Sequence, residues 1–423
     1  MSNARKVVAN ALLRVEKDKA YSNIVINEAI KSASLDRQDA AFATRLFYGV
    51  LERKITLDYY IRQLSSQPLN KVSPLAREVL RCGIFQILYM DKVPVSAAVN
   101  ESVNIIKKSK ESRAAGYVNA VLRGILRNRP SLPPKTTAHG LSVNYSCNEN
   151  LINLYVKDYG LDETEKFLSS ALDSSKVYIR VNTQKNSVDE LIELLNEQGI
   201  TAEKNVINNS LCLINVGAIE SNKLYLEGRF HVQDLSSQTC ADFVSAESGH
   251  NFLDMCAAPG GKSFTVCENM KNIGKIISCD LHKSRVDLIA DGAKRLGLDI
   301  ISPKVMDATK YDDNLSETFD RVLCDVPCSG SGVIGRKPDI KYKDFSDLDE
   351  LSDIQSAILE NGFKYLKKSG RLVYSTCSIL KKENEEVINK FLECNSQAKL
   401  ISMHTFLPQN DNTDGFFVAV IEK

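Results

Sequence analysis

The sequence predicts a multidomain protein with an all-α N-terminal domain, a small α+β middle domain and a doubly wound α/β C-terminal domain. At 423 residues the chain is too long for one ordinary core. Its first third shows only the periodicity of amphipathic helices. From Gln233 onward, strand-like runs alternate with helical runs, which is typical of a parallel sheet with helices on both faces.

Residues 1–132 are expected to form the all-helical domain. Ser73 followed by Pro74 is a strong helix start, and apolar residues follow it at helical spacing. Residues 1–140 hold 23 of the 54 Lys and Arg but only 11 of the 53 Asp and Glu. This excess indicates a contact with a polyanion, although a solvated helical surface would give the same composition.

Residues 141–233 are expected to form the small α+β domain, after a proline-rich break at 130–134. An alternating strand pattern covers 177–182, and an amphipathic helix covers 188–198. Two further short apolar runs, 211–216 and 229–232, are predicted strands.

Residues 234–423 are expected to form the α/β domain. Its predicted strands are 251–255, 275–279, 301–306, 320–324, 370–375 and 416–421. Its predicted helices are 262–271, 282–296, 349–367 and 383–393. Open sheets of this kind bind their ligands at the carboxyl ends of the strands, so the residues that follow each strand are the candidates for function.

A glycine-rich turn follows the first of these strands and opens a helix. It is close to a nucleoside triphosphate loop, but the required first glycine is replaced by Cys256, and Pro259 removes a backbone donor. Asp280 follows the second strand, where an acid can accept hydrogen bonds from ribose hydroxyls. Asp307 follows the third strand, where an acid can hold an adenine amino group. Together they indicate an adenosine site without a pyrophosphate cradle, which fits S-adenosylmethionine. The candidate cofactor-binding residues are Cys256, Ala257, Ala258, Pro259, Gly260, Gly261, Lys262, Asp280, Asp307 and Asp325.

Two cysteines follow two later strands. Cys328 lies in the run Asp325-Val326-Pro327-Cys328, and Cys377 lies in Ser375-Thr376-Cys377-Ser378. A cysteine is most often a small buried hydrophobe. Here both thiols should lie at strand ends beside a nucleotide-type cofactor, and this placement favours covalent catalysis on an electron-poor ring.

Composition excludes several other classes. No apolar stretch reaches the roughly 20 residues of a membrane helix, and the N-terminus shows no signal peptide, so we expect no membrane partner. The 11 cysteines are odd in number and several lie in predicted strands, which indicates a reducing cytoplasm. No Cys-x-x-Cys pair occurs, so we expect no metal. We also expect a monomer.

These motifs resemble those of the RNA (cytosine-5)-methyltransferases, the Nol1/Nop2/Sun family. The resemblance covers about 175–423 and rests on the runs 254–262, 325–328 and 375–378, with 233–238, 336–339, 383–385 and 176–183 in support. Gly116 to Arg123 and the basic helices resemble a NusB-type RNA-binding domain. That combination resembles the bacterial 16S rRNA methyltransferase B subgroup.

The resemblance implies a Rossmann-like methyltransferase domain that uses S-adenosylmethionine to methylate C5 of a cytosine in 16S rRNA. It assigns Cys377 as the nucleophile that adds to C6, and Cys328 as the thiol that helps product release. Asp325 would hold the N3 edge of the base. Lys262 would orient the base or lower the pKa of a thiol.

Four alternatives stay open at this stage. The same chemistry could act on tRNA or 23S rRNA. A DNA cytosine methyltransferase would use Cys328 as the nucleophile and leave Cys377 without a role. An amino-group methyltransferase would carry an aromatic residue at position 328. A NusB-like antitermination factor would leave the whole cofactor site unexplained.

Overall fold

The structure is a computed structural model that describes residues 4–18, 22–172, 176–214, 216–217, 219–411 and 413–423. Residue 215, inside the predicted strand 211–216, lies outside these ranges. The chain divides into two compact units. Unit 1 comprises residues 1–172 and 337–344, and unit 2 comprises residues 173–336 and 345–423.

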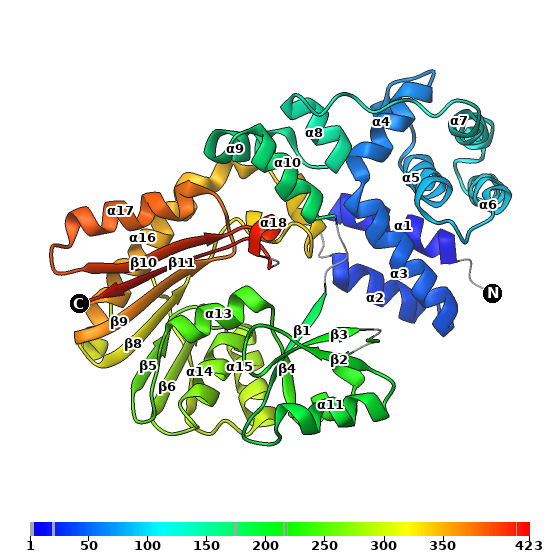
Figure 1. Ribbon diagram of the computed structural model, residues 1–423. Helices are drawn as coiled ribbons and strands as arrows, with labels where there is room; N and C mark the ends of the chain where they lie inside the picture. The colour runs from blue at the N-terminus through cyan, green and yellow to red at the C-terminus, as the bar shows by residue number, and fades with distance from the viewer. Residues whose placement is uncertain (1–3, 19–21, 173–175, 215, 218, 412) are drawn as a thin grey trace. The chain divides into compact units, whose positions relative to one another are not determined.

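The described part of unit 1 is helical, which confirms the all-α prediction (Figure 1). Its helices are α1 Ala4–Asp18, α2 Ser22–Ser32, α3 Arg37–Glu52, α4 Lys54–Leu64, α5 Pro74–Tyr89, α6 Val95–Lys107, α7 Ala115–Arg127, α8 Ala138–Tyr145, α9 Glu149–Tyr159 and α10 Leu161–Ser170. Pro74 is the first residue of α5, where its missing N–H costs no helical hydrogen bond. Apolar faces of α1 to α7 share one core that includes Phe47, Leu80 and Leu122.

Residues 337–344 belong to unit 1 although they follow Cys328 closely in the chain. Lys341 is 1% exposed, and its Nζ donates to the carbonyl oxygens of Glu52 and Tyr145, each at 3.2 Å. These two residues end α3 and α8, and helix C-termini favour a cation. Long-range docking of this kind leaves no local sequence pattern, so the sequence did not predict it.

Unit 2 begins with an antiparallel four-stranded sheet in the order β2-β3-β1-β4. The strands are β1 Val177–Val181, β2 Thr201–Lys204, β3 Ser210–Ile214 and β4 Phe230–Val232, with helices α11 Val188–Glu197 and α12 Lys223–Leu226. This confirms the small α+β prediction. β2 was not predicted, because only Ala202 of its four residues is buried and no apolar alternation marks it.

The larger sheet of unit 2 has seven strands in the order β10-β11-β9-β8-β5-β6-β7 (Figure 1). They are β5 Asn251–Asp254, β6 Lys275–Asp280, β7 Ile301–Val305, β8 Phe319–Asp325, β9 Leu366–Thr376, β10 Lys399–Phe406 and β11 Phe416–Glu422. Five strands are parallel, as expected, but β11 is antiparallel to both β9 and β10, so the sheet is mixed. Local patterning carries no information on strand direction. The edge strand β10 was missed because it has no fully buried residue.

Helices cover both faces of this sheet, as predicted (Figure 1). They are α13 Leu235–Phe243, α14 Gly261–Asn269, α15 Lys283–Leu296, α16 Leu348–Tyr365 and α17 Glu385–Cys394; the short α18 is Pro408–Asp411. Successive strand residues join opposite cores: Phe252 packs with α13 to α15, and Leu253 packs with α16 and α17. No helix in the described ranges is long and apolar enough to cross a bilayer.

The strand order reverses direction between β5 and β8. From β5 the chain proceeds outward through β6 to β7, and it then returns to β8 on the other side of β5 and continues to β9. Sheets of this type form a ligand crevice at the carboxyl ends of the strands where the order reverses. The loop after β5 and the end of β8 therefore mark the expected site.

Candidate active site

Lys262 and Asp325 meet at this reversal point. Lys262 is the second residue of α14, directly after the β5 loop, and Asp325 ends β8. The Nζ of Lys262 donates to one oxygen of Asp325 at 2.7 Å, and the Oγ of Ser375 donates to the other at 2.8 Å. Burial alone would lower the pKa of Lys262, but the Asp325 carboxylate outweighs it and raises this pKa above its usual value. The lysine is therefore a permanent cation that fixes the carboxylate.

The structure brings the two predicted thiols together. The Sγ atoms of Cys328 and Cys377 lie 3.2 Å apart, within hydrogen-bonding distance for sulfur. They are neighbours because β8 and β9 are adjacent parallel strands whose carboxyl ends meet at one edge. The hydrogen bond with Cys377 raises the pKa of Cys328 well above its usual value, and burial and the nearby negative charge of Glu383 add to this effect. Cys328 therefore carries a proton at neutral pH.

The candidate cofactor loop runs from Cys256 to Gly261 and is tied to the sheet by its backbone. The N–H of Ala257 donates to the carbonyl of Cys279, in β6, at 2.7 Å. Gly260 has a φ of +113°, and a Cβ there would lie 2.3 Å from the ring of Phe264. Position 260 therefore requires glycine both for its conformation and for space.

The two acids at the ends of β6 and β7 differ in their surroundings. Asp280 is 4% exposed, lies 3.3 Å from the Nη1 of Arg285 and accepts a 3.3 Å bond from the N–H of His282. Asp307 is more exposed and accepts from the N–H and Oγ1 of Thr309, at 3.1 and 2.6 Å. The bond from the Thr309 hydroxyl is the main cause that lowers the pKa of Asp307. Among the described hydrogen bonds, none joins Asp307 to the cofactor loop.

A pocket of about 150 Å³ opens between the cofactor loop and the Lys262–Asp325 pair. Its lining includes Asp234 and Asp254, two acids of the sequence motifs that were not predicted to belong to the site. Asp254 ends β5, and burial raises its pKa to about 7. One of its oxygens accepts from the Oγ of Ser263 at 2.7 Å, whereas the other is buried and has no partner in the described part of the chain. Asp254 ends a strand, and this is the same sequence feature by which Asp280 was predicted to belong to the site.

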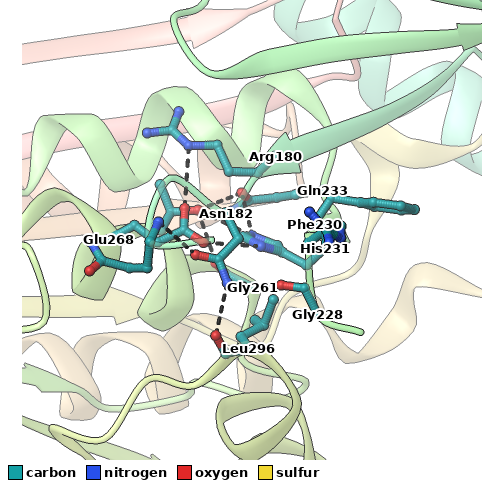
Figure 2. A network of polar contacts seen from close by, with 12 residues as sticks. Arg180, Asn182, Gly228, Phe230, His231, Gln233, Gly261, Glu268 and Leu296 are labelled. Atoms are coloured by element: carbon teal, nitrogen blue, oxygen red, sulfur yellow. Dashed lines mark hydrogen bonds and ion pairs between the residues drawn. The ribbon is translucent and has the colours of Figure 1, made fainter. Parts of the chain in front are cut away.

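A second buried polar cluster links the small sheet to α14. Figure 2 shows Arg180, His231 and Glu268 converging close to Gly261 of the cofactor loop. Glu268 lies 3.8 Å from the Nε of Arg180 and 3.7 Å from the Nδ1 of His231. Burial lowers the pKa of His231 to about 3 and raises that of Glu268 to about 8. Both side chains are therefore mainly neutral at pH 7.

Hydrogen bonds extend this cluster. The Oε1 of Gln233 accepts a 2.6 Å bond from Thr265 in α14 and lies 3.3 Å from the Nε2 of His231. The Nδ2 of Asn182 donates to the carbonyls of Gly228 and Leu296, each at 2.8 Å (Figure 2). The helix α14, which starts at the cofactor loop, is thus bonded to Gln233, the residue after β4, while Asn182, the residue after β1, is bonded to the last residue of α15.

Three parts of the sequence match known protein families. Residues 242–422 match the 16S rRNA methyltransferase RsmB/F family, residues 2–127 match the NusB family, and residues 148–220 match the ferredoxin-like domain of the RsmF/B-like methyltransferases. A probable ribosomal RNA small subunit methyltransferase B of Bacillus subtilis is 37% identical over 100% of this chain and 99% of its own length. The ribosomal RNA small subunit methyltransferase B of Pasteurella multocida is 31% identical over 100% of this chain and 96% of its own.

Solved structures agree with the sequence comparison. The crystal structure of the protein PH0851 has a TM-score of 0.84 and 28% identity, and covers 100% of this chain and 99% of its own. NSun6 from Pyrococcus horikoshii, with a TM-score of 0.61 and 21% identity over 65% of this chain and 98% of its own, shares the fold. The resemblance that the motifs indicated is confirmed: the chain belongs to the 16S rRNA methyltransferase RsmB/F family and is a methyltransferase with a NusB domain and a ferredoxin-like domain.

Proposed function

We propose that this protein methylates C5 of a specific cytosine in 16S rRNA, with S-adenosylmethionine as the methyl donor and a covalent bond between Cys377 and C6. The main support is the pair of thiols 3.2 Å apart at adjacent strand ends, close to the Lys262–Asp325 pair. The names of the relatives support a ribosomal RNA of the small subunit as substrate.

The residues around the β5 loop fit S-adenosylmethionine. Asp254 lines the pocket there and has one buried oxygen that accepts no hydrogen bond among the described residues, and a glycine turn allows close approach of a ligand to the backbone. Residues 256–262, Asp280, Asp307 and Asp325 would hold the cofactor. When bound, it supplies an electrophilic methyl carbon to the base.

The chain's own groups supply the activation of the ring. C5 of cytosine is a poor nucleophile until a thiolate adds to C6 and the C5–C6 double bond is lost. Cys328 carries a proton that it can share with Cys377, and an S–H donor stabilises the Cys377 thiolate. As the S–C6 bond forms, N3 takes a proton from water, and the Asp325 carboxylate, held by Lys262 and Ser375, accepts a hydrogen bond from the new N3–H.

Release reverses the addition. After methyl transfer a water molecule takes the proton on C5, the electron pair of that C–H bond re-forms the C5–C6 double bond, and the S–C6 bond breaks with its electron pair returning to Cys377 as a thiolate. The S–H of Cys328, within hydrogen-bonding distance of the leaving sulfur, stabilises this thiolate.

The target base must leave its stack to reach the thiols. The basic N-terminal third supplies the charge for contacts with the RNA backbone, which position the substrate without reading its sequence.

Bisulfite sequencing of total RNA tests the function. A strain that lacks the gene should lose 5-methylation at one cytosine of 16S rRNA. The wild-type gene should restore it, whereas a gene that encodes Cys377→Ala should not. Loss at a cytosine of tRNA or 23S rRNA instead would reassign the substrate, and loss at no cytosine would reject the reaction.

The cofactor site has its own prediction. Asp280→Ala should weaken S-adenosylmethionine binding by at least about tenfold, because a carboxylate that accepts hydrogen bonds from ribose is lost. Calorimetry measures this, with Asp287→Ala, on the exposed face of α15, as the matched control. Unchanged affinity of the Asp280 variant would reject its assignment to the ribose.

A further inference from the structure

Glu383 lies in the short turn that follows the Cys377 loop, and it is fully buried. Its carboxylate accepts four hydrogen bonds. One oxygen accepts from the N–H of Ser329 at 2.8 Å and from the Nε2 of Gln355 at 3.0 Å. The other accepts from the hydroxyls of Ser329 and Ser378, each at 2.5 Å.

The two serines are the residues that directly follow the two cysteines. Ser329 is joined to Cys328 by one peptide bond, and Ser378 is joined in the same way to Cys377. Ser329, Ser378 and Glu383 are each at most 5% exposed. A single buried carboxylate therefore binds both thiol-bearing loops at equivalent positions.

Further bonds close the same cluster. The hydroxyl of Ser331 lies 2.8 Å from that of Ser378 and accepts a 3.1 Å bond from the N–H of Ile379. The N–H of Gly332 donates to the carbonyl of Cys377 at 2.9 Å. The Cys328 loop is thus fixed against the Cys377 loop over several residues, with Glu383 as the shared acceptor.

Burying a carboxylate is costly, and apolar packing could stabilise the fold equally well. A carboxylate that accepts several hydrogen bonds also fixes the positions and directions of the groups that donate to it. The chemistry proposed above gives Glu383 no role, although it depends on the spacing between the two sulfur atoms.

We propose that Glu383 is the positioning residue that sets the spacing of the two thiols, through the serine that follows each cysteine. This inference rests on the proposed function, in which one thiol forms the adduct and the other assists its release. The negative charge of Glu383 also contributes to the raised pKa of Cys328. It therefore helps to keep the proton on Cys328.

Phenylarsine oxide measures the spacing directly, because the trivalent arsenic binds tightly only when two thiols can reach it together. The wild-type protein should bind one equivalent through this pair, and Cys328→Ala should lose that binding. Glu383→Ala should weaken it by at least about tenfold, because both loops lose their shared acceptor. Glu386→Ala, an exposed acid three residues along the chain, is the matched control and should bind as the wild type does.

Two further variants keep the test decisive if Glu383→Ala does not fold. Glu383→Gln can keep every contact, since its amide can donate to both hydroxyls while its oxygen accepts from Ser329 and Gln355. It should therefore retain arsenical binding within about threefold. Ser378→Ala removes the bond from the Cys377 loop and should weaken binding. Wild-type arsenical affinity in both Ser378→Ala and Glu383→Ala would overturn the inference.

Methylation kinetics separate this inference from the function on which it rests. Glu383→Ala should lower kcat while the affinity for S-adenosylmethionine stays unchanged, and Glu383→Gln should restore much of the rate. A variant that loses arsenical affinity but keeps the wild-type kcat would also overturn the positioning role. If the wild-type protein does not methylate cytosine, the proposed function fails, and the arsenical affinities still decide whether Glu383 sets the spacing.

Discussion

Two buried carboxylates of unit 2, Glu383 and Glu268, have opposite surroundings. Glu383 accepts four hydrogen bonds from groups that bracket the two thiols. Both oxygens of Glu268 are buried and have no hydrogen-bond partner among the described residues; the Nδ1 of His231 and the Nε of Arg180 lie 3.7 and 3.8 Å away. The number of hydrogen-bond donors around a buried carboxyl group, rather than its burial, therefore decides its role. A group with several donors holds its neighbours in place, whereas a group without donors is neutral in the folded protein.

Glu383 and Glu268 should differ most in the free energy of unfolding that is lost when each is replaced by alanine. Glu383→Ala should lower the free energy of unfolding by about 3 kcal/mol, because the Ser329 N–H and the neighbouring hydroxyls lose their acceptor in a dry site. Glu268→Ala should cost about 1 kcal/mol, since it breaks no hydrogen bond. Urea unfolding at pH 7 measures both, and equal losses would contradict the distinction.

A second effect should follow from the proton on Glu268. Its pKa is raised from 4.5 to about 8 on folding, so the native state binds more protons between these pH values and loses stability as pH rises through them. Glu268→Gln should remove this loss, and the variant should gain roughly 3 kcal/mol relative to the wild type between pH 5 and pH 8. Urea unfolding at these two pH values checks the gain. His231, with its lowered pKa, contributes with the opposite sign below pH 6.5 and is common to both proteins.

The smallest effect concerns a neutral bond at the edge of the Glu268 cluster. Thr265→Val should lower the free energy of unfolding by about 1–2 kcal/mol, because the Oε1 of Gln233 loses its 2.6 Å donor while the side-chain volume is kept. The loss should be independent of pH, since no titrating group is removed. A pH-dependent loss would show that this bond is coupled to the proton on Glu268.

Local patterns in the sequence predicted the helical first third, six of the seven strands of the larger sheet, and the strand-end loops near which Cys328, Cys377, Lys262 and Asp325 gather. They could do so because strand periodicity and glycine turns are local properties. The antiparallel β11, the polar edge strand β10 and the docking of residues 337–344 on unit 1 depend on long-range pairing, which such patterns do not record.

Glu383 illustrates the same limit within the site. It lies in the quoted run 383–385, but nothing in that run indicates its function. Its four donors come from residues 329, 355 and 378, which only the folded chain brings together. Asp254, in contrast, carried the strand-end signal and could have been assigned from the sequence.

A denaturing gel of protein incubated with 16S rRNA and S-adenosylmethionine tests the two-thiol mechanism most directly. Cys328→Ala should accumulate a covalent protein–RNA band, because addition through Cys377 proceeds while release is impaired. Cys377→Ala should give no band and no methylation. A band from Cys377→Ala and none from Cys328→Ala would reverse the two roles and contradict the mechanism.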